Sequence, residues 1–307
     1  MTLRPIATAL LTWFERHGRS ALPWRTDRDP YRIVVSEFML QQTQVDRVVP
    51  IFEAFVAAWP SFDVLAAASQ ADVVRAWAGL GYNSRAVRLH RLARAVRDDH
   101  AGRLPRDEES LRALPGVGPY TARAIAAFAF DADVVAIDTN IRRIIHRTQL
   151  GLEWPPRASA AELDELASAL VPPDAGYAFN SALMDLGATL CSARAPKCLL
   201  CPLRASCAAA PVDAATLAFA AATYAPGRTP QERLPFEATT RYVRGRVLDR
   251  LRALAPGEAI SLLHLATELG PRLAPNHREP RAFASIVAGL ERDGFVERQD
   301  DRIRLGT

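Results

Sequence analysis

Apolar residues recur every three or four positions along the first 210 residues, the spacing that gathers them on one face of an α-helix. Glycine or proline interrupts this periodicity and predicts where helices end. The groups with helical spacing are Ile6 to Phe14, Val48 to Phe55 and Val73 to Leu80, and the breaks are Leu22-Pro23, Trp59-Pro60, Gly79 to Gly81, Gly102 to Pro105 and Val171 to Pro173. No convincing alternating strand pattern precedes the last tenth of the chain. The sequence therefore predicts an all-α core.

The pattern changes after Cys207. Residues 211–238 lack clear periodicity and are rich in proline, which predicts a linker. Beyond the linker we expect a small module at residues 239–307. Its expected elements are helices at 242–254, 262–269 and 283–292 and strands at 295–298 and 302–305, joined by a turn at Asp300-Asp301. Three helices closed by a hairpin are typical of a winged-helix-like α+β module.

The composition sets broad limits. A chain of 307 residues, of which 49% are hydrophobic, has room for two compact domains and a smaller module. A net charge of +4 suits a polyanionic partner, although many soluble enzymes are as basic. The apolar stretch from Ile6 to Phe14 runs directly into charged residues without a cleavage site, and residues 205–228 are too interrupted to span a bilayer. We expect a cytoplasmic protein.

The chain has only four cysteines, and they are concentrated within 17 residues. They are Cys191, Cys198, Cys201 and Cys207. Structural zinc favours two C-x2-C pairs separated by a longer loop, whereas one central C-x2-C flanked by single cysteines is typical of a [4Fe-4S] cluster. Zinc remains the first alternative. Disulfide bonds are the second, and they need an oxidising compartment for which the sequence has no signal.

Two basic residues, Arg194 and Lys197, lie in the loop between the first two cysteines, and Lys197 is the only lysine of the chain. Pinned by a metal centre, this loop would be suited to contact phosphate. The alternative is that both charges only solvate a surface loop, and charge alone favours that alternative.

The segment Leu114 to Ala122 contains Gly116, Val117 and Gly118 and separates a helix that ends near Ala113 from an apolar helix that continues to Phe130. Glycines allow a sharp turn that points backbone amides outward, towards a phosphate that also faces the start of the next helix. This is a helix-hairpin-helix pattern. The alternative is a tight turn without a ligand.

Two carboxyl groups occupy contrasting settings. Glu37 lies in the apolar run 33–40, where desolvation would raise its pKa as a general acid requires. The alternative is a first-turn glutamate behind Ser36 as N-cap. Asp138 follows an apolar run and begins a helix whose amides would keep it ionised, or it is simply a helix cap. Such a pair suits cleavage of an N-glycosidic bond, which needs an acid for the leaving base and a carboxylate for the sugar cation.

Together these segments resemble the helix-hairpin-helix DNA glycosylases and, within them, the MutY family of adenine glycosylases. The resemblance covers about residues 5 to 210. It rests on Leu22 to Arg25, Val35 to Val45, Gly79 to Tyr82, the hairpin, Asp138, Asn140, Met184 to Ala188 and the cysteine spacing. It implies a six-helix domain with the helix-hairpin-helix at residues 28–135 and an iron-sulfur helical domain formed by residues 1–27 and 136–210.

The resemblance also implies an activity and its residues. The protein would act as a monomer on double-stranded DNA and remove adenine mispaired with 8-oxoguanine or guanine. Glu37 would protonate adenine and activate water, Asp138 would stabilise the sugar cation, and Tyr120 and Asn140 would assist. The base pocket would include Trp24, Arg25 and Ser181; Gln41 and Tyr82 would wedge into the duplex where the base is flipped; and Gln42, Gly116, Val117, Gly118, Arg194 and Lys197 would also contact DNA.

Similar enzymes of the endonuclease III type place a lysine where this chain has Tyr120, and that amine also nicks the strand. Because Lys197 lies among the cysteines, no lysine is available for such a Schiff base. The resemblance therefore implies a monofunctional glycosylase without lyase activity.

Three features depart from the family pattern. We do not recognise the usual C-terminal domain that reads 8-oxoguanine, Ser181 stands where the family usually has a longer polar side chain, and Asp138-Thr139-Asn140 replaces the commoner Asp-Gly-Asn. A thymine or uracil mismatch glycosylase of the same superfamily is therefore an alternative, although the run Met39 to Gln44 favours the adenine enzyme. A non-catalytic iron-sulfur protein that binds DNA is the alternative from another class.

Overall fold

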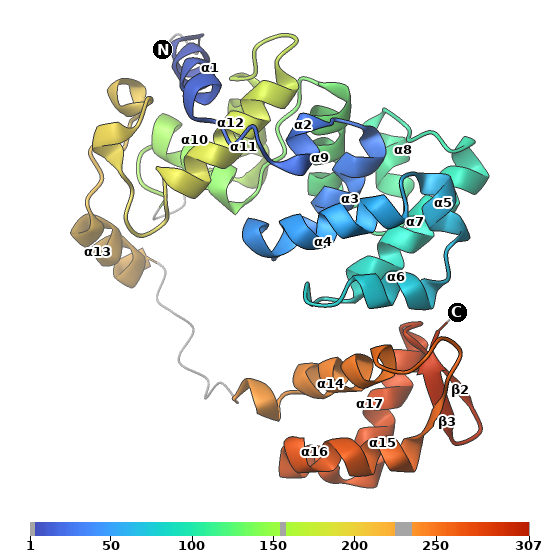
Figure 1. The fold of residues 1–307 in the computed structure, drawn as a ribbon. Helices are drawn as coiled ribbons and strands as arrows, with labels where there is room; N and C mark the ends of the chain where they lie inside the picture. Colours follow the sequence, from blue (N-terminus) through green and yellow to red (C-terminus); the bar gives the residue numbers. More distant parts are fainter. Residues whose placement is uncertain (1–3, 154–157, 225–234, 307) are drawn as a thin grey trace. The chain divides into compact units, whose positions relative to one another are not determined.

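A computed structural model of the chain describes residues 4–153, 158–224 and 235–306, and over these residues the fold is predominantly helical (Figure 1). Contacts divide the chain into two compact units. The first comprises residues 1–37 and 104–229, and the second comprises residues 38–103 and 230–307. Helix α3 (Pro30–Leu40) begins in the first unit and ends in the second. The largely helical core that the sequence predicts is confirmed.

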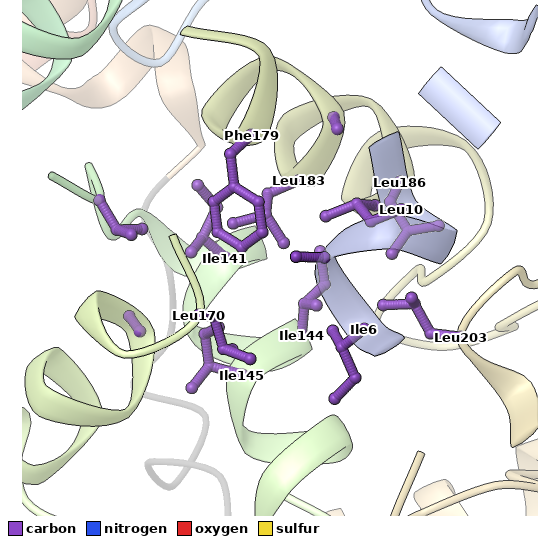
Figure 2. Packing of buried hydrophobic residues seen from close by; sticks show 14 of the residues in the cluster. Ile6, Leu10, Ile141, Ile144, Ile145, Leu170, Phe179, Leu183, Leu186 and Leu203 are labelled. Atoms are coloured by element: carbon purple, nitrogen blue, oxygen red, sulfur yellow. The ribbon is translucent and has the colours of Figure 1, made fainter. Parts of the chain in front are cut away.

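In the first unit, α1, α10, α11 and α12 contribute to a hydrophobic core (Figure 2). Its helices are α1 (Arg4–His17), α2 (Pro23–Thr26), the start of α3, α8 (Glu108–Ala113), α9 (Pro119–Phe130), α10 (Thr139–Gln149), α11 (Ala160–Ser168), α12 (Gly176–Thr189) and α13 (Ala214–Tyr224), with short 3-10 helices η1 (Cys198–Leu200) and η2 (Arg204–Ser206). The core includes Ile6, Leu10, Ile141, Ile144, Ile145, Leu170, Phe179, Leu183, Leu186 and Leu203. This packing fixes α10 against α12.

Local sequence explains where these helices begin and end. Pro23 and Pro119 occupy the first turns of α2 and α9, where a missing amide hydrogen costs nothing. A capping box between Ser159 and Glu162 starts α11. The Asp138 side chain accepts a hydrogen bond from the amide of Ile141 and so starts α10.

The second unit begins with four helices. They are α4 (Val45–Ala58), α5 (Phe62–Ala67), α6 (Gln70–Ala76) and α7 (Ser84–His100). Phe52, Phe55, Trp77 and Leu89 are fully buried among them, and the rings of Phe55 and Trp77 meet edge to face at 6.0 Å. The turn between α6 and α7 needs left-handed backbone at Gly79 and Gly81, which glycine adopts without strain.

The C-terminal part of the second unit is an α+β module. Its elements are η3 (Phe236–Ala238), α14 (Thr240–Arg252), β1 (Ile260–Ser261), α15 (Leu262–Leu269), η4 (Gly270–Arg272), α16 (Pro275–Arg278), α17 (Pro280–Arg292), β2 (Val296–Gln299) and β3 (Arg302–Leu305) (Figure 1). The strands form an antiparallel sheet in the order β1-β3-β2, with Ile260 opposite Ile303 and Val296 opposite Leu305. The predicted helices and hairpin are confirmed. Strand β1 was not predicted, because two residues are too short to show an alternating pattern.

Residues 211–238, interpreted from the sequence as a linker, include helix α13. Its 11 residues are mostly alanine and have no distinct polar face, so periodicity does not reveal it. Pro226, Gly227 and Pro230, which also marked that stretch, lie outside the described residues. The domain boundaries inferred from the sequence remain a prediction; the division by contacts groups residues 104–135 with the first unit. Among the described residues, no helix combines the length and apolar character needed to cross a bilayer.

Candidate functional site

Glu37 lies in the last turns of α3 and is only 9% exposed. Its neighbours Ser36 and Phe38 are also buried. The alternative in which Ser36 caps a helix and Glu37 occupies its first turn is wrong, because α3 begins at Pro30 and the Ser36 hydroxyl donates to the carbonyl of Ile33 within the helix. Desolvation is the main cause that raises the pKa of Glu37 to about 7, and the nearby charge of Asp138 adds to it.

Asp138 stands immediately before α10 and uses both carboxylate oxygens. Oδ1 accepts from the amide of Ile141 at 2.7 Å, and Oδ2 accepts from the side-chain amide of Asn140 at 3.0 Å. It is therefore a helix cap, as one interpretation of the sequence proposed. Its charge also acts on Glu37, so the cap is part of an electrostatic pair of carboxyl groups.

Tyr120 lies in the first turn of α9, directly after the hairpin. Burial, followed by the charges of Glu37 and Asp138, raises its pKa well above the ordinary value. The phenol thus stays protonated at neutral pH and is available as a hydrogen-bond donor. The structure brings Glu37, Asp138 and Tyr120 within electrostatic range of one another, although they come from three helices.

Arg25 is held by Asp185, a fully buried carboxylate of α12. The guanidinium donates to both oxygens, at 2.7 and 3.1 Å, and the backbone amide of Arg19 donates to the same carboxylate at 2.9 Å. Burial acts to raise the pKa of Asp185, but the hydrogen bonds and charges of the two arginines outweigh it and lower that pKa. The positive charge of Arg25 in turn moderates the raised pKa of Glu37.

Trp24 and Ser181, the other two residues predicted for a base pocket, are both buried. The hydroxyl of Ser181 has no hydrogen-bond partner among the described residues, which is unusual for a side chain with 0% exposure. The role of Trp24, Arg25 and Ser181 in binding a base remains a prediction.

A chain of hydrogen bonds connects Asp138 to the cysteine segment. Asn140, which donates to Asp138, accepts from Arg143 at 2.8 Å. The same guanidinium donates to the carbonyl oxygens of Cys191, at 2.7 Å, and Gly187, at 3.0 Å. One turn of α10 thus links the capping carboxylate to the first cysteine.

Two residues of α12 support this arrangement. A Cβ atom at Gly187 would lie 2.7 Å from the Cβ of Asn140, so only glycine allows this close packing of α12 on α10. The side chain of Asn180 accepts from the amide of Ala136 at 2.9 Å and donates to the carbonyl of Val134 at 2.7 Å. It therefore fixes the extended segment that leads into Asp138.

The hairpin has the predicted form, since α8 ends at Ala113 and α9 starts at Pro119. Gly116 adopts a φ of +81°, and Val117 is buried beneath the turn. No hydrogen-bond partner among the described residues accepts from the backbone amides of Gly116 and Gly118. A Cβ at Gly118 would meet open space, so packing alone does not explain this glycine.

The four cysteines line a single cavity together with apolar side chains such as Leu186, Leu190 and Val212. Burial is the main cause that raises the pKa of Cys201 to about 11, and the charges of the other three cysteines add to it. Among the described residues, no three metal-binding side chains converge as ligands of one metal ion would.

Arg147, almost completely buried, braces the loop that follows Cys191. It pairs with Glu153 at 2.6 Å, donates to the carbonyl oxygens of Ser192 and Ala193, and approaches the sulfur of Cys191 at 3.6 Å. Arg194 and Lys197 are exposed on the same loop, so their side chains are accessible to a partner.

In the second unit, a buried arginine joins two loops that carry predicted DNA contacts. Arg85 donates to seven acceptors at 2.5–3.4 Å: the carbonyl oxygens of Phe38, Met39, Gln41, Leu80, Gly81 and Tyr82 and the hydroxyl of Thr43. Gln42 and Tyr82 both have positive φ, an uncommon conformation outside glycine. Arg85 thus holds both turns in conformations that the backbone alone disfavours.

The sequence interpretation did not identify Arg85, Arg143, Asn180 or Asp185 as parts of these sites. A polar or charged residue on an otherwise apolar helix face was the available signal. Asn180 follows the buried Phe179, and Arg85 precedes the buried Ala86 and Val87.

Comparison with known proteins gives two consistent results. Residues 35–173 match the family described as HhH-GPD superfamily base excision DNA repair protein. The adenine DNA glycosylase of Mycolicibacterium smegmatis is 43% identical over 302 residues, covering 98% of this chain and 95% of the relative. The adenine DNA glycosylase of Mycobacterium tuberculosis is 44% identical over 253 residues, covering 80% of this chain and 78% of the relative.

Solved structures also resemble the chain. A thermostable thymine-DNA glycosylase matches with 32% identity and a TM-score of 0.61, covering 67% of this chain and 94% of the other. An endonuclease III–DNA complex matches with 21% identity and a TM-score of 0.57, covering 67% and 95%, which shows a common fold. The predicted helix-hairpin-helix glycosylase fold is thereby confirmed.

Proposed function

The chain belongs to the adenine DNA glycosylase family, and from that premise we propose that it removes adenine mispaired with 8-oxoguanine or guanine from double-stranded DNA in base excision repair. The carboxyl pair Glu37 and Asp138 carries this proposal. Glu37 has a pKa of about 7, so a large fraction is protonated at neutral pH, while both oxygens of Asp138 accept hydrogen bonds as suits a carboxylate.

The reaction needs one proton transfer in each direction. Glu37 donates its proton to a ring nitrogen of adenine, and the bond between the sugar C1′ and the base breaks with its electron pair leaving on adenine. Asp138 stabilises the resulting sugar cation. Water then adds to C1′ and gives its proton to the Glu37 carboxylate, which restores the acid.

Tyr120 and Asn140 assist in different ways. Tyr120, kept protonated by its surroundings, supplies a hydrogen bond beside the carboxyl pair. Asn140 orients Asp138 through its 3.0 Å hydrogen bond. Trp24, Arg25 and Ser181 complete the base pocket, in which Arg25 contributes mainly its charge because Asp185 occupies its guanidinium.

Contacts with the duplex come from four segments. Gln41 and Tyr82 enter it where the base is displaced, and Gln42 also contacts DNA; these residues lie on the turns that Arg85 holds. The free amides of Gly116 and Gly118, beside Val117, receive a phosphate at the start of α9, and the exposed Arg194 and Lys197 contact another. We further propose that the protein acts as a monomer in the cytoplasm.

We propose no lyase activity. Schiff-base chemistry needs an amine next to C1′, and the only lysine, Lys197, lies in the cysteine loop. Tyr120, which follows the hairpin, cannot form such an intermediate.

We propose that Cys191, Cys198, Cys201 and Cys207 hold a [4Fe-4S] cluster. The four residues line one cavity with apolar walls, and one central C-x2-C flanked by single cysteines is typical of such a cluster. When bound, such a cluster supplies a redox-capable centre that pins the loop. Arg147 and Arg143 hold the protein side of that loop through backbone carbonyls.

One observation favours a second candidate. The solved thymine-DNA glycosylase is 32% identical to this chain, so the excised base is the property that needs the most direct test. Single-turnover excision should be measured on duplexes with A opposite 8-oxoguanine, A·G, T·G, U·G and hypoxanthine pairs. We expect adenine opposite 8-oxoguanine or guanine to be released fastest, without strand cleavage. Faster release of thymine would overturn the choice, and binding to these duplexes without release of any base would favour the non-catalytic alternative.

A further inference from the structure

A groove of about 1180 Å³ lies within the second unit, between the turn at Tyr82 and the C-terminal module. One wall comes from α4, the Tyr82 turn and α7, and the other from α14 and the end of α17. We call it the arginine groove, because its lining includes Arg47, Arg88, Arg91, Arg241, Arg244 and Arg292.

Direct contacts hold the module beside this turn. Arg252 of α14 donates to the carbonyl of Val74 at 3.0 Å and to the side chain of Asn83 at 2.7 Å. The side chain of Gln70 donates to the carbonyl of Gly294. Both walls of the groove are therefore fixed by hydrogen bonds that do not use its lining arginines.

The charge of the groove is strongly one-sided. Its only lining carboxylate among the described residues is Asp293, which pairs with Arg244. Arg47, Arg88, Arg91 and Arg292 are exposed, and none of them has an ion-pair partner among the described residues. Clustered guanidinium groups without acidic partners repel one another, and such an arrangement is stabilised when an anion binds between them.

The groove is continuous with the turn that the proposed function places in the duplex. The guanidinium of Arg241 lies 4.9 Å from the centre of the Tyr82 ring and its Nη1 atom is 3.4 Å from the Tyr82 hydroxyl. Small-molecule pockets usually measure about 300–1,000 Å³ and are mostly apolar. A larger cavity with six arginines suits an extended polyanion better than a small ligand.

We infer that the arginine groove binds the phosphodiester backbone of the DNA duplex next to the point where Tyr82 enters it. The C-terminal module thereby forms one wall of the DNA-binding surface. This inference rests on the proposed function for its ligand. Contacts of this kind add affinity and register without reading sequence.

The test changes one arginine on each wall. In Arg88→Gln/Arg292→Gln, two exposed side chains without ion pairs are neutralised, one from α7 and one from α17. The matched control, Arg94→Gln/Arg281→Gln, removes the same charge from exposed positions on the same two helices outside the groove. Binding to a 30-base-pair duplex with A opposite 8-oxoguanine is measured from about 50 to 200 mM salt, together with excision at saturating protein.

We expect the groove variant to bind at least about tenfold more weakly than the wild type and to lower the slope of log affinity against log salt by about two, since each lost phosphate contact changes it by about 0.9. The control should keep the wild-type affinity, salt slope and rate of excision. An unchanged affinity and slope in the groove variant would overturn the inference. So would single variants in which Arg88→Gln alone accounts for the whole effect, because the module would then contribute no contact.

The two proposals fail separately. If the wild type releases no adenine, the proposed function is wrong, whatever the salt dependence. If adenine is released but the groove variant binds like the wild type, only the groove inference is wrong. If Arg88→Gln/Arg292→Gln folds poorly, Arg91→Gln/Arg241→Gln replaces it, because it also removes one arginine from each wall of the groove.

Discussion

Arg143 donates a hydrogen bond to the backbone carbonyl of Cys191 at 2.7 Å while also holding Asn140 at 2.8 Å. Asn140 in turn donates to Asp138. The orientation of the Asp138 carboxylate, which we propose to stabilise the sugar cation, thus depends on hydrogen bonds that reach the backbone of Cys191. Gly187 makes this link possible, since α12 can approach Asn140 closely only where no side chain intervenes.

Arg143→Gln should slow adenine release by about tenfold or more, because the lost hydrogen bonds, worth about 1–2 kcal/mol, orient a group in the reaction. Single-turnover excision at saturating protein gives this rate free of binding effects. The neighbouring exposed Arg142→Gln is the matched control and should retain the wild-type rate. A wild-type rate in Arg143→Gln would mean that Asn140 needs no support.

The raised pKa of Glu37 predicts a specific dependence of stability on pH. The folded protein holds the Glu37 proton up to a pKa of about 7, against an ordinary value of 4.5, so its free energy of unfolding falls as pH rises between these values and is constant above them. Glu37→Gln has no carboxyl group to titrate, so its stability does not fall in this way. The difference in free energy of unfolding, in favour of Glu37→Gln over the wild type, should grow from near zero below pH 4.5 to about 3 kcal/mol above pH 7.

Urea unfolding at several pH values measures this difference, with exposed Glu109→Gln as the control. If the difference in free energy of unfolding between the wild type and Glu37→Gln does not change with pH, Glu37 is not held protonated by burial. The rate of base release should likewise decline above pH 7 as the acid form of Glu37 is lost.

Cys198→Ser should remove the visible absorbance of the iron-sulfur cluster and lower the bound iron, because one thiolate ligand is lost. DNA affinity should fall more than the rate of the chemical step, since the loop with Arg194 and Lys197 loses its anchor. Ser206→Ala, in the same segment between Cys201 and Cys207, is the control. Unchanged absorbance and iron content in Cys198→Ser would exclude this sulfur as a ligand.

Arg85→Met should destabilise the protein by about 3 kcal/mol, because buried carbonyl groups at the end of α3 and in the Tyr82 turn lose their donor. The exposed Arg88→Met, one turn further along α7, should change stability by less than about 0.5 kcal/mol. Urea unfolding of both variants provides the comparison. Equal stability of the two would show that water replaces the guanidinium without cost.

Short-range patterns in the sequence predicted much of this protein. The hairpin limits at Ala113 and Pro119, the start of α10 behind Asp138 and the C-terminal helices and hairpin all follow from residues close in the chain. The four cysteines share one cavity as their spacing suggested. Capping, periodicity and turn residues act over a few positions, which is why they can be recognised without a structure.

The long-range hydrogen bonds that hold the site residues in place could not be predicted in the same way. Arg25 and Asp185 are 160 positions apart, Arg143 and Cys191 are 48 apart, and Arg85 reaches back 46 positions to Met39. Such pairs depend on how helices pack, and no local pattern encodes them. The apolar surroundings of Glu37 were predicted correctly. The position of Glu37 within its helix was left open, because the start of α3 at Pro30, and not at Ser36, is not evident from the sequence.

Single-turnover release of adenine opposite 8-oxoguanine, compared between the wild type and Glu37→Gln with binding to the same duplex measured in parallel, tests the central claim most directly. The Glu37 carboxyl as general acid predicts a rate about 100- to 10,000-fold lower in the variant, with a dissociation constant that stays within about twofold. A variant that still releases adenine at the wild-type rate, or one that loses activity only because it no longer binds DNA, would contradict it.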